Sequence, residues 1–249
     1  MKDNAAFTLM GTLLVLSILA CSLTINDNSG STIVRGSGTV VEEKRDVNNI
    51  SAVDLAMPGT LFITMGSSDS LRIEAEDNLL QYIQTEVRAG RLVIETRQGI
   101  RLESNRPINY YLTVHQLDAI AISSSGDIKA EDLHSTSFSA QISSSGNLSI
   151  RRLTAESISV KISSSGNLEI LDGQVPQQTI SISSSGEYRA RDLASVEADV
   201  SLTSSGTATL RVSDHLSGSL SSSGNVYYIG NPDVKMSMTS SGRTVQINE

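Results

Sequence analysis

The sequence predicts an all-β fold, a parallel β-solenoid with about 20 residues in each coil. Three observations support this prediction. A four-residue motif returns at a nearly fixed interval, the residues around it alternate between apolar and polar, and aromatic residues make up only 4% of the chain. A constant period of this length is typical of stacked repeats, which do not need the large side chains of a conventional core.

The repeated motif is Ser-Ser-Ser-Gly, with Thr in place of the first Ser in two copies. It first stands at residues 123–126, and successive copies are 20, 20, 20, 20, 18 and 18 residues apart. We expect each closing glycine to form a corner of the coil by adopting a positive φ, which is sterically free for glycine. The corner glycines are Gly126, Gly146, Gly166, Gly186, Gly206, Gly224 and Gly242.

Alternation around the motif predicts which side chains point inward. Ile120 and Ile122 before the motif, and Ile128 and Ala130 after it, are spaced two apart, as in strands with one buried face. Continued through the motif, the alternation points the middle Ser inward, where its hydroxyl can bond to the backbone or to the next Ser. This inward column is Ser124, Ser144, Ser164, Ser184, Ser204, Ser222 and Ser240.

The first and third residues of each motif then point outward and form two rows of hydroxyls, about 4.8 Å apart along the stack. We interpret these rows as a candidate face for a repetitive partner such as a glycan, or even ice. The alternative is that Ser and Gly are needed only to turn each coil. The outward residues are Ser123, Ser125, Ser143, Ser145, Ser163, Ser165, Ser183, Ser185, Thr203, Ser205, Ser221, Ser223, Thr239 and Ser241.

Residues 1–20 resemble the signal peptide of a bacterial lipoprotein. The apolar run at residues 7–20 follows Lys2, and its 14 residues are fewer than the roughly 20 that a transmembrane helix needs. It ends in Ile-Leu-Ala before Cys21, the only cysteine of the chain, which is similar to a lipobox. The resemblance implies cleavage before Cys21 and lipidation of this residue, which would hold the protein at a membrane. The alternatives are an ordinary signal peptide and an uncleaved anchor.

The rest of the chain is expected to form one β-solenoid domain over residues 39–249, joined to Cys21 by a flexible tether over residues 21–38 that is rich in Ser, Gly and Asn. Residues 119–249 are expected to form regular coils, and residues 39–118 more irregular ones. Within the irregular part we predict a hairpin over residues 83–94 and at most one helical turn near Asn78. Residues 109–114 are predicted to be the strand that leads into the first regular coil.

The irregular part resembles a known family. The segment LRIEAEDNLLQYIQTEV at 71–87, GRLVI at 90–94, and the segments at 50–63 and 117–128 match the GIN domain in order and spacing. This family of bacterial surface proteins is provisionally described as the head domain of auto-transporter adhesins, and also as a domain of unknown function. The resemblance covers roughly residues 47–230. It implies a right-handed parallel β-helix and offers no catalytic residues to carry over.

The sequence offers no catalytic or metal-binding constellation. His115, His134 and His215 stand at unrelated phases of the repeat, and no zinc-binding spacing exists. The residues after the glycines, such as Asp127 and Asn147, form a mixed column that we interpret as a turn preference. Carboxylates at the second turn alternate with arginines, and we interpret them as a solvated ladder of mixed charge. These residues are Asp132, Asp172, Asp192 and Asp214, with Arg151, Arg152, Arg189, Arg191 and Arg211.

Because the loops are only a few residues long, we expect no walls for a pocket, no cofactor, no metal and no enzymatic activity. The net charge of −8 argues against nucleic-acid binding, which needs a basic patch. We predict a lipid-anchored, extracytoplasmic interaction module of the bacterial cell envelope or surface that binds glycan or protein. The alternative is a structural envelope protein without a soluble ligand, and a polysaccharide lyase is a remote third. An open strand edge at the terminal coil also suggests self-association.

Overall fold

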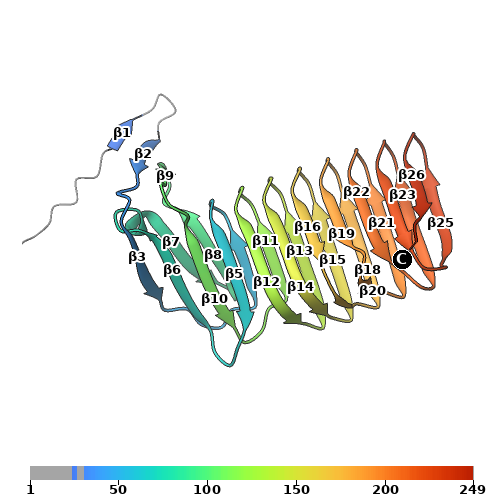
Figure 1. The fold of residues 1–249 in the computed structure, drawn as a ribbon, viewed down its shortest axis with the longest axis horizontal. Helices are drawn as coiled ribbons and strands as arrows, with labels where there is room; N and C mark the ends of the chain where they lie inside the picture. The colour runs from blue at the N-terminus through green and yellow to red at the C-terminus, as the bar shows by residue number, and fades with distance from the viewer. Residues whose placement is uncertain (1–23, 27–30, 249) are drawn as a thin grey trace, which may run out of the picture.

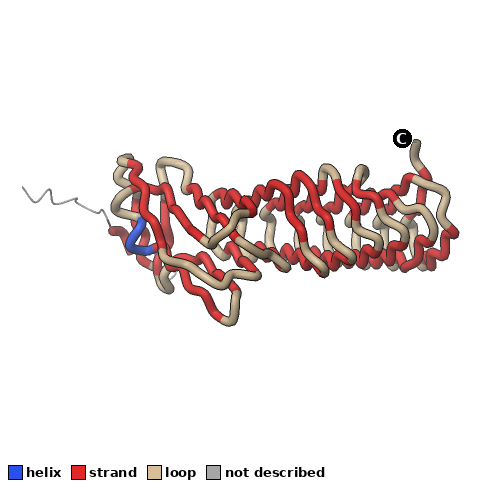
Figure 2. The backbone as a smooth tube through the Cα atoms, turned by 90° about the horizontal axis from the view of Figure 1, so that it is seen from below, coloured by secondary structure: helices blue, strands red, loops and turns tan. Residues whose placement is uncertain are grey.

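The computed structural model describes residues 24–26 and 31–248, so the predicted signal peptide and Cys21 lie outside the described residues. The described chain confirms the predicted β-solenoid, since it consists of strands and one short 3-10 helix. Figure 1 shows the coils stacked side by side along the long axis of the molecule. In the second view, two rows of strands run along the stack and loops join them (Figure 2).

Each regular coil contributes one strand to each of two sheets. The strand before the Ser-Ser-Gly corner belongs to what we call the entry sheet, and the strand after it belongs to the exit sheet. The entry strands are β11 (Ala119–Ile122), β13 (Ser137–Ile142), β15 (Ser157–Ile162), β18 (Gln177–Ile182), β21 (Glu197–Leu202), β23 (His215–Leu220) and β25 (Asp233–Met238). The exit strands are β12 (Asp127–His134), β14 (Asn147–Thr154), β16 (Asn167–Ile170), β19 (Glu187–Ala190), β22 (Thr207–Arg211), β24 (Asn225–Ile229) and β26 (Arg243–Gln246), with the short strands β17 (Gly173–Gln174) and β20 (Leu193–Ala194) at the second turn.

Strands of neighbouring coils pair in parallel and keep equivalent positions in register. Ile122 pairs with Ile142, and Leu202 still pairs with Leu220 where the step falls to 18 residues. The two missing residues are therefore taken from the turn opposite the corner. The apolar positions predicted to point inward around the first motif, such as Ile122 and Ile128, are buried. Each apolar layer is thus covered by the coils on both sides, which supplies the stability that one coil lacks.

The core also holds one polar pair that the alternation does not reveal. Tyr188 and Gln178 are both buried, and the Tyr188 hydroxyl donates to Gln178 Oε1 at 2.6 Å. Burial raises the pKa of the Tyr188 phenol, so it stays a neutral donor. An aromatic ring with a polar tip can replace an aliphatic residue in the stack because the entry strand of the same coil supplies an acceptor.

The corner glycines are required by packing, and the expected positive φ is wrong for them. None of the seven belongs to the glycines of the described chain that have positive φ. Instead, a Cβ on Gly166 would lie 2.5 Å from the carbonyl oxygen of Gly146 and 2.7 Å from that of Ser144. The coils approach so closely at the corner that a side chain has no room, which is the other reason for which proteins use glycine.

The N-terminal half is not a simple series of irregular coils. β4 (Ala52–Leu55) and β5 (Thr60–Met65) form the coil that pairs with β11 and β12. β8 (Arg91–Thr96) and β10 (Asn109–Val114) form the next coil outward, so the order in space differs from the order in the chain. The predicted strand at 109–114 is confirmed.

Antiparallel strands close this end of the stack and form what we call the antiparallel cap, or simply the cap. β6 (Ser70–Glu76) lies between β10 and β3 (Val40–Arg45), and β7 (Ile83–Arg88) pairs with β8 in the predicted hairpin. The hairpin turn at Ala89 and Gly90 has positive φ at both residues, which matches the twist of the strands. The 3-10 helix η1 (Leu80–Tyr82) is the short helical turn expected here.

The predicted flexible tether is wrong for residues 32–38. β2 (Thr32–Arg35) pairs in parallel with β9 (Ile100–Glu103), and β1 (Thr24–Asn26) pairs with β2. Beyond β2, the Ser37 amide donates to Asn78 Oδ1 at 2.9 Å, and Asn78 Nδ2 donates to the Arg35 carbonyl at 2.7 Å. The small polar residues of this segment serve as hydrogen-bonding partners of the cap, so the folded domain begins before residue 39.

The carboxylate of Glu76 fastens this segment to the cap. It is fully buried, and it accepts hydrogen bonds from the Gly38 amide at 2.6 Å, the Asn105 amide at 2.9 Å and the Ser104 hydroxyl at 2.8 Å. Gly36 lies so close that a Cβ there would overlap the carboxylate. A buried charge is tolerated when donors surround it, as they do here.

The C-terminal coil leaves its strand edges open to pairing, whereas the N-terminal end of the stack is closed by the antiparallel strands. Of the described strands, β25 and β26 each have a partner on one side only, and the side chains of Val234, Met238 and Val245 are exposed. At the other end, β3 carries consecutive charges at residues 42–45, which discourage edge pairing. Self-association through the open C-terminal edge stays a prediction.

We expect Gly166→Ala to lower the free energy of unfolding by about 1–3 kcal/mol, the usual cost of inserting atoms into a packed site. The clash is with Cγ2 of the buried Ile142 and with two backbone carbonyls, which cannot turn away as a side chain can. Ser165→Ala is the matched control and should change stability by less than about 0.5 kcal/mol. Urea titrations of both variants measure the difference, and equal stability would show that packing does not require the glycine.

We expect Glu76→Gln to lower the free energy of unfolding by about 1–3 kcal/mol, because its amide turns a donor toward other donors. Burial opposes ionisation of Glu76, but hydrogen bonds from Ser104, Asn105 and Gly38 outweigh it and hold the pKa below its ordinary value. This stabilisation is complete above the ordinary glutamate pKa and is lost as the pH falls through the lower folded-state pKa. Unfolding titrations at neutral and acid pH should show a steeper acid loss for the unsubstituted protein than for the variant. Parallel curves would contradict this role.

Candidate functional site

The outward hydroxyl rows lie along the turn that joins the entry and exit sheets. All fourteen side chains are exposed. Some of them have partners within the chain: Ser123 Oγ donates to Asp54 Oδ1 at 2.8 Å, and Ser143 Oγ donates to the Ile122 carbonyl at 3.5 Å. The rows are accessible along the whole stack, and their use as a binding face stays a prediction.

The middle Ser of each motif is half-buried, apart from Ser240 in the last coil, which is exposed. Ser124 Oγ lies 3.4 Å from the Leu55 carbonyl, to which it donates, and it accepts from the Gly126 amide at 3.2 Å. These bonds satisfy backbone groups at the corner, where the strand pairing is interrupted. The contacts of Ser124 therefore support a structural use of this column.

Charged side chains on the exit sheet are paired with one another. Arg151 Nη2 lies 2.5 Å from Asp132 Oδ1, and Arg152 Nη2 lies 2.8 Å from Asp172 Oδ2. Farther along, Arg211 and Asp192 are 3.8 Å apart. These side chains are partly to largely exposed, so the pairs form the expected solvated ladder and each contributes little.

The column after the glycines is a second ladder, made by hydrogen bonds. Asn147 Nδ2 donates to Asp127 Oδ1 at 2.8 Å, and Asn167 Nδ2 donates to Asn147 Oδ1 at 2.9 Å. The three histidines are exposed. Among residues 24–26 and 31–248, no group of three or more His, Cys, Asp or Glu side chains is placed to hold a metal ion.

One row across the exit sheet combines aromatic rings with cations. Phe62 and Tyr111 stack with centroids 5.2 Å apart, Arg72 lies 3.9 Å from the Tyr111 centroid, and Lys129 lies 5.8 Å from the Phe62 centroid. Each ring thus has a neighbour on both faces. This arrangement stabilises the sheet through stacking and cation–π contacts but leaves no ring face free for a ligand.

The second turns of successive coils line a groove, which we call the turn groove. Its wider part has a volume of about 920 Å³. A second hollow of about 320 Å³ continues it, because Gln174 and Pro176 line both. The wider part is lined by Gln116, Asp118, His134, Ser135, Thr136, Ser137, Thr154, Ala155, Glu156, Gln174 and Pro176. Short loops were expected to leave no walls for a pocket, and that expectation is wrong.

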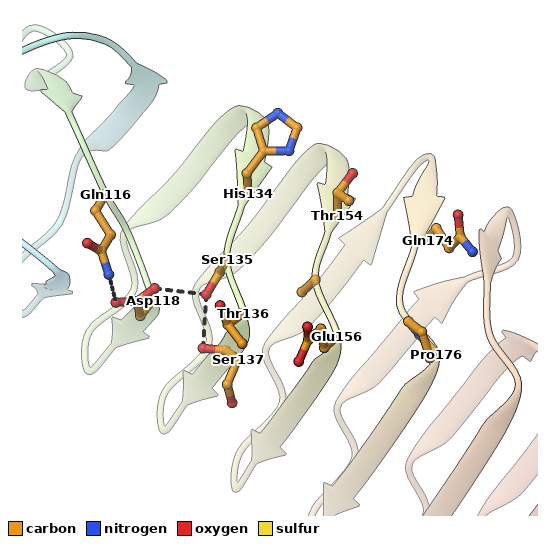
Figure 3. A pocket seen from close by; sticks show the side chains of 11 residues that line it. Gln116, Asp118, His134, Ser135, Thr136, Ser137, Thr154, Glu156, Gln174 and Pro176 are labelled. Atoms are coloured by element: carbon orange, nitrogen blue, oxygen red, sulfur yellow. Dashed lines mark hydrogen bonds between the residues drawn. The ribbon is translucent and has the colours of Figure 1, made fainter.

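Two lines of side chains border the turn groove. The exit rim consists of the last residues of four exit-sheet strands, which pair in register: His134, Thr154, Gln174 and Ala194. The entry rim consists of the residues shortly before the entry strands: Thr136, Glu156, Pro176 and Val196. Figure 3 shows the labelled members of the two rims following one another from coil to coil. The walls of the groove are therefore made by stacking and need no long loop.

Several polar groups of the rims have no partner within the part of the chain that the structure describes. Among the described residues, five rim side chains make no hydrogen bond or ion pair: His134, Thr136, Thr154, Glu156 and Gln174. All five are exposed and line the groove. At one end of the groove, by contrast, Asp118 is engaged by Gln116 Nε2 at 2.6 Å and by Ser135 Oγ at 2.8 Å (Figure 3). The rims thus offer donors and acceptors to a ligand without breaking internal bonds.

A sequence-family comparison agrees with the architecture. The family model described as "Putative auto-transporter adhesin, head GIN domain" matches residues 49–232. The chain belongs to this family. The GIN domain therefore includes β6 and β7 of the antiparallel cap, most of the regular coils and the turn groove. No curated protein sequence matches the chain.

Solved structures share the fold. A "putative adhesin" from Bacteroides fragilis superposes with a TM-score of 0.79 at 19% identity, covering 86% of this chain and 99% of its own. A "putative adhesin" from Parabacteroides distasonis gives a TM-score of 0.69 at 20% identity, with 86% and 100% covered. A "putative lipid binding protein" from the same species gives 0.72 at 18% identity, with 86% and 99% covered. At identities this low, the superpositions show that these proteins share the fold of this chain.

The part of the chain that the structure describes contains no helix long and apolar enough to span a bilayer.

Proposed function

We propose that this GIN-domain protein is a non-enzymatic interaction module on the outside of a bacterial cell envelope, where it contacts glycan or protein in adhesion. The turn groove carries the proposal, because its rims present polar side chains that have no partner among the described residues, along one accessible side of the stack. The adhesin descriptions of the family and of similar structures support it. A structural envelope protein without a ligand is the alternative.

The proposal includes a lipid anchor at Cys21. The apolar segment at 7–20, the Ile-Leu-Ala sequence before Cys21 and the lack of any other cysteine support lipidation there. Several acyl chains on one residue hold a protein firmly at a bilayer. The anchor would place the antiparallel cap nearest to the membrane, with the open coil farthest from it.

We expect beads that carry the full chain in detergent to bind a glycan array or bacterial cells. Heat-unfolded protein on the same beads is the control for non-specific adsorption. Bound glycans should be recovered at their original length, because the proposal assigns no chemistry to the groove. Shortened glycans would indicate a lyase or hydrolase, and a complete lack of binding would favour the structural alternative.

We expect Cys21→Ala to move the protein from the membrane fraction to the soluble fraction of the cell, since it removes the sulfur that carries the lipid. Ser22→Ala is the matched control and should remain with the membrane. Immunoblots of fractionated cells measure the distribution. A Cys21→Ala protein that stays in the membrane would point to an uncleaved anchor.

A further inference from the structure

Each of four successive coils adds one exit-rim and one entry-rim side chain to the turn groove, so the groove has a regular spacing that bears on its ligand class. We propose that the groove binds one neutral polysaccharide chain, laid along the stack with about one sugar unit for each coil spacing. The inference rests on the proposed function and narrows it from glycan or protein to one class of ligand at one site.

The spacing of the rims favours a sugar polymer over a peptide. Register pairing along the exit rim places His134, Thr154 and Gln174 one strand spacing apart, about 4.8 Å. An extended pyranose unit is roughly as long as this spacing. A peptide strand repeats its side-chain direction only every two residues, roughly 6.6 Å, and falls out of step with the rims after a few coils.

The backbone of the groove is also closed to an added peptide strand. The Ser135 amide donates to the Thr154 carbonyl at 3.1 Å, and the Ala155 amide donates to the Gln174 carbonyl at 3.2 Å. On the entry side, the Glu156 amide donates to the Thr136 carbonyl at 3.0 Å. Strand addition relies on free main-chain groups, and the coils use these groups to pair with one another.

The lining further argues against a protein partner and an acidic glycan. Protein interfaces depend on buried Trp, Tyr and Arg anchors, and none of these residues lines the wider part of the groove. The same part holds the carboxylates of Asp118 and Glu156 and no Lys or Arg. An acidic polymer would meet like charge there, and Arg211, which lines the narrower hollow, already lies 3.8 Å from Asp192.

The available side chains suit the hydroxyl groups of a neutral sugar. Glu156 accepts hydrogen bonds, Thr154 and Gln174 can both donate and accept, and none of the three has an internal partner among the described residues. Farther along the entry rim, Pro176 and the exposed Val196 present apolar surface to the C–H faces of sugar rings. Because each contact is weak, affinity should grow with the number of units bound.

The test measures binding of the full chain in detergent to galactomannan and mixed-linkage β-glucan, with polygalacturonate as the acidic polymer. Thr154→Trp places an indole on the exit rim and should lower affinity for the neutral polymers at least about tenfold. Thr179→Trp, the same exchange at an exposed site on the outer face of the entry sheet, should stay within about twofold. Affinity for oligosaccharides should rise with length until the chain spans the groove. Unchanged thermal unfolding of both variants shows that they are folded.

The outcomes separate this inference from the proposed function. If Ser165→Trp at the corner abolishes glycan binding and Thr154→Trp does not, the groove is not the site, although the interaction module stands. Equal or tighter binding of polygalacturonate also overturns the inference. Binding to cells without binding to any of these polysaccharides rejects the ligand class alone. Failure to bind any polymer or cell rejects both proposals.

Discussion

The structure depends on hydrogen bonds that join each coil to the one before it at a single strand spacing. These bonds continue up to the corners, where the amides of Ser143 and Ser163 donate to the carbonyls of Ile122 and Ile142 at 3.0 and 2.9 Å. Because backbone hydrogen bonds fix the distance between coils, they also fix the space available for a side chain at each corner. Glycine is the residue that fits, and the buried Ile columns beside it fill the interior of the coil.

The same spacing orders the outside of the molecule. Side chains at equivalent positions must form rows. Carboxylate and amide side chains give a hydrogen-bonded ladder at Asp127, Asn147 and Asn167, and opposite charges give a salt-bridged ladder at Asp132 and Arg152. The turn groove is made in the same way, from two rows whose polar side chains have no partners among the described residues. A surface of this kind suits ligands that are themselves periodic, which links the fold to the adhesin role proposed for this GIN domain.

The sequence predicts the structure well where the repeat determines it, and poorly where the structure depends on contacts between residues far apart in the chain. Alternation around Ile122 and Ile128 predicted the buried columns, because a strand has only two faces. The role of the corner glycines was missed, since room for a Cβ depends on the neighbouring coil and on no local signal. The clamp at Glu76 and the pairing of β2 with β9 were missed for a similar reason, because both join residues far apart in the chain. The groove could have been found by aligning His134, Thr154 and Gln174 as a column.

The attachment of the N-terminal segment has a mechanical consequence. A pull on this segment reaches β2 and the bonds of Gly38 and Asn105 to Glu76 before it reaches the stacked coils. The cap therefore bears the load first, and the coils behind it keep their spacing while these contacts hold. A cell attached in flowing liquid through such a molecule would depend on the pairing of β2 with β9 and on the hydrogen bonds to the buried carboxylate of Glu76.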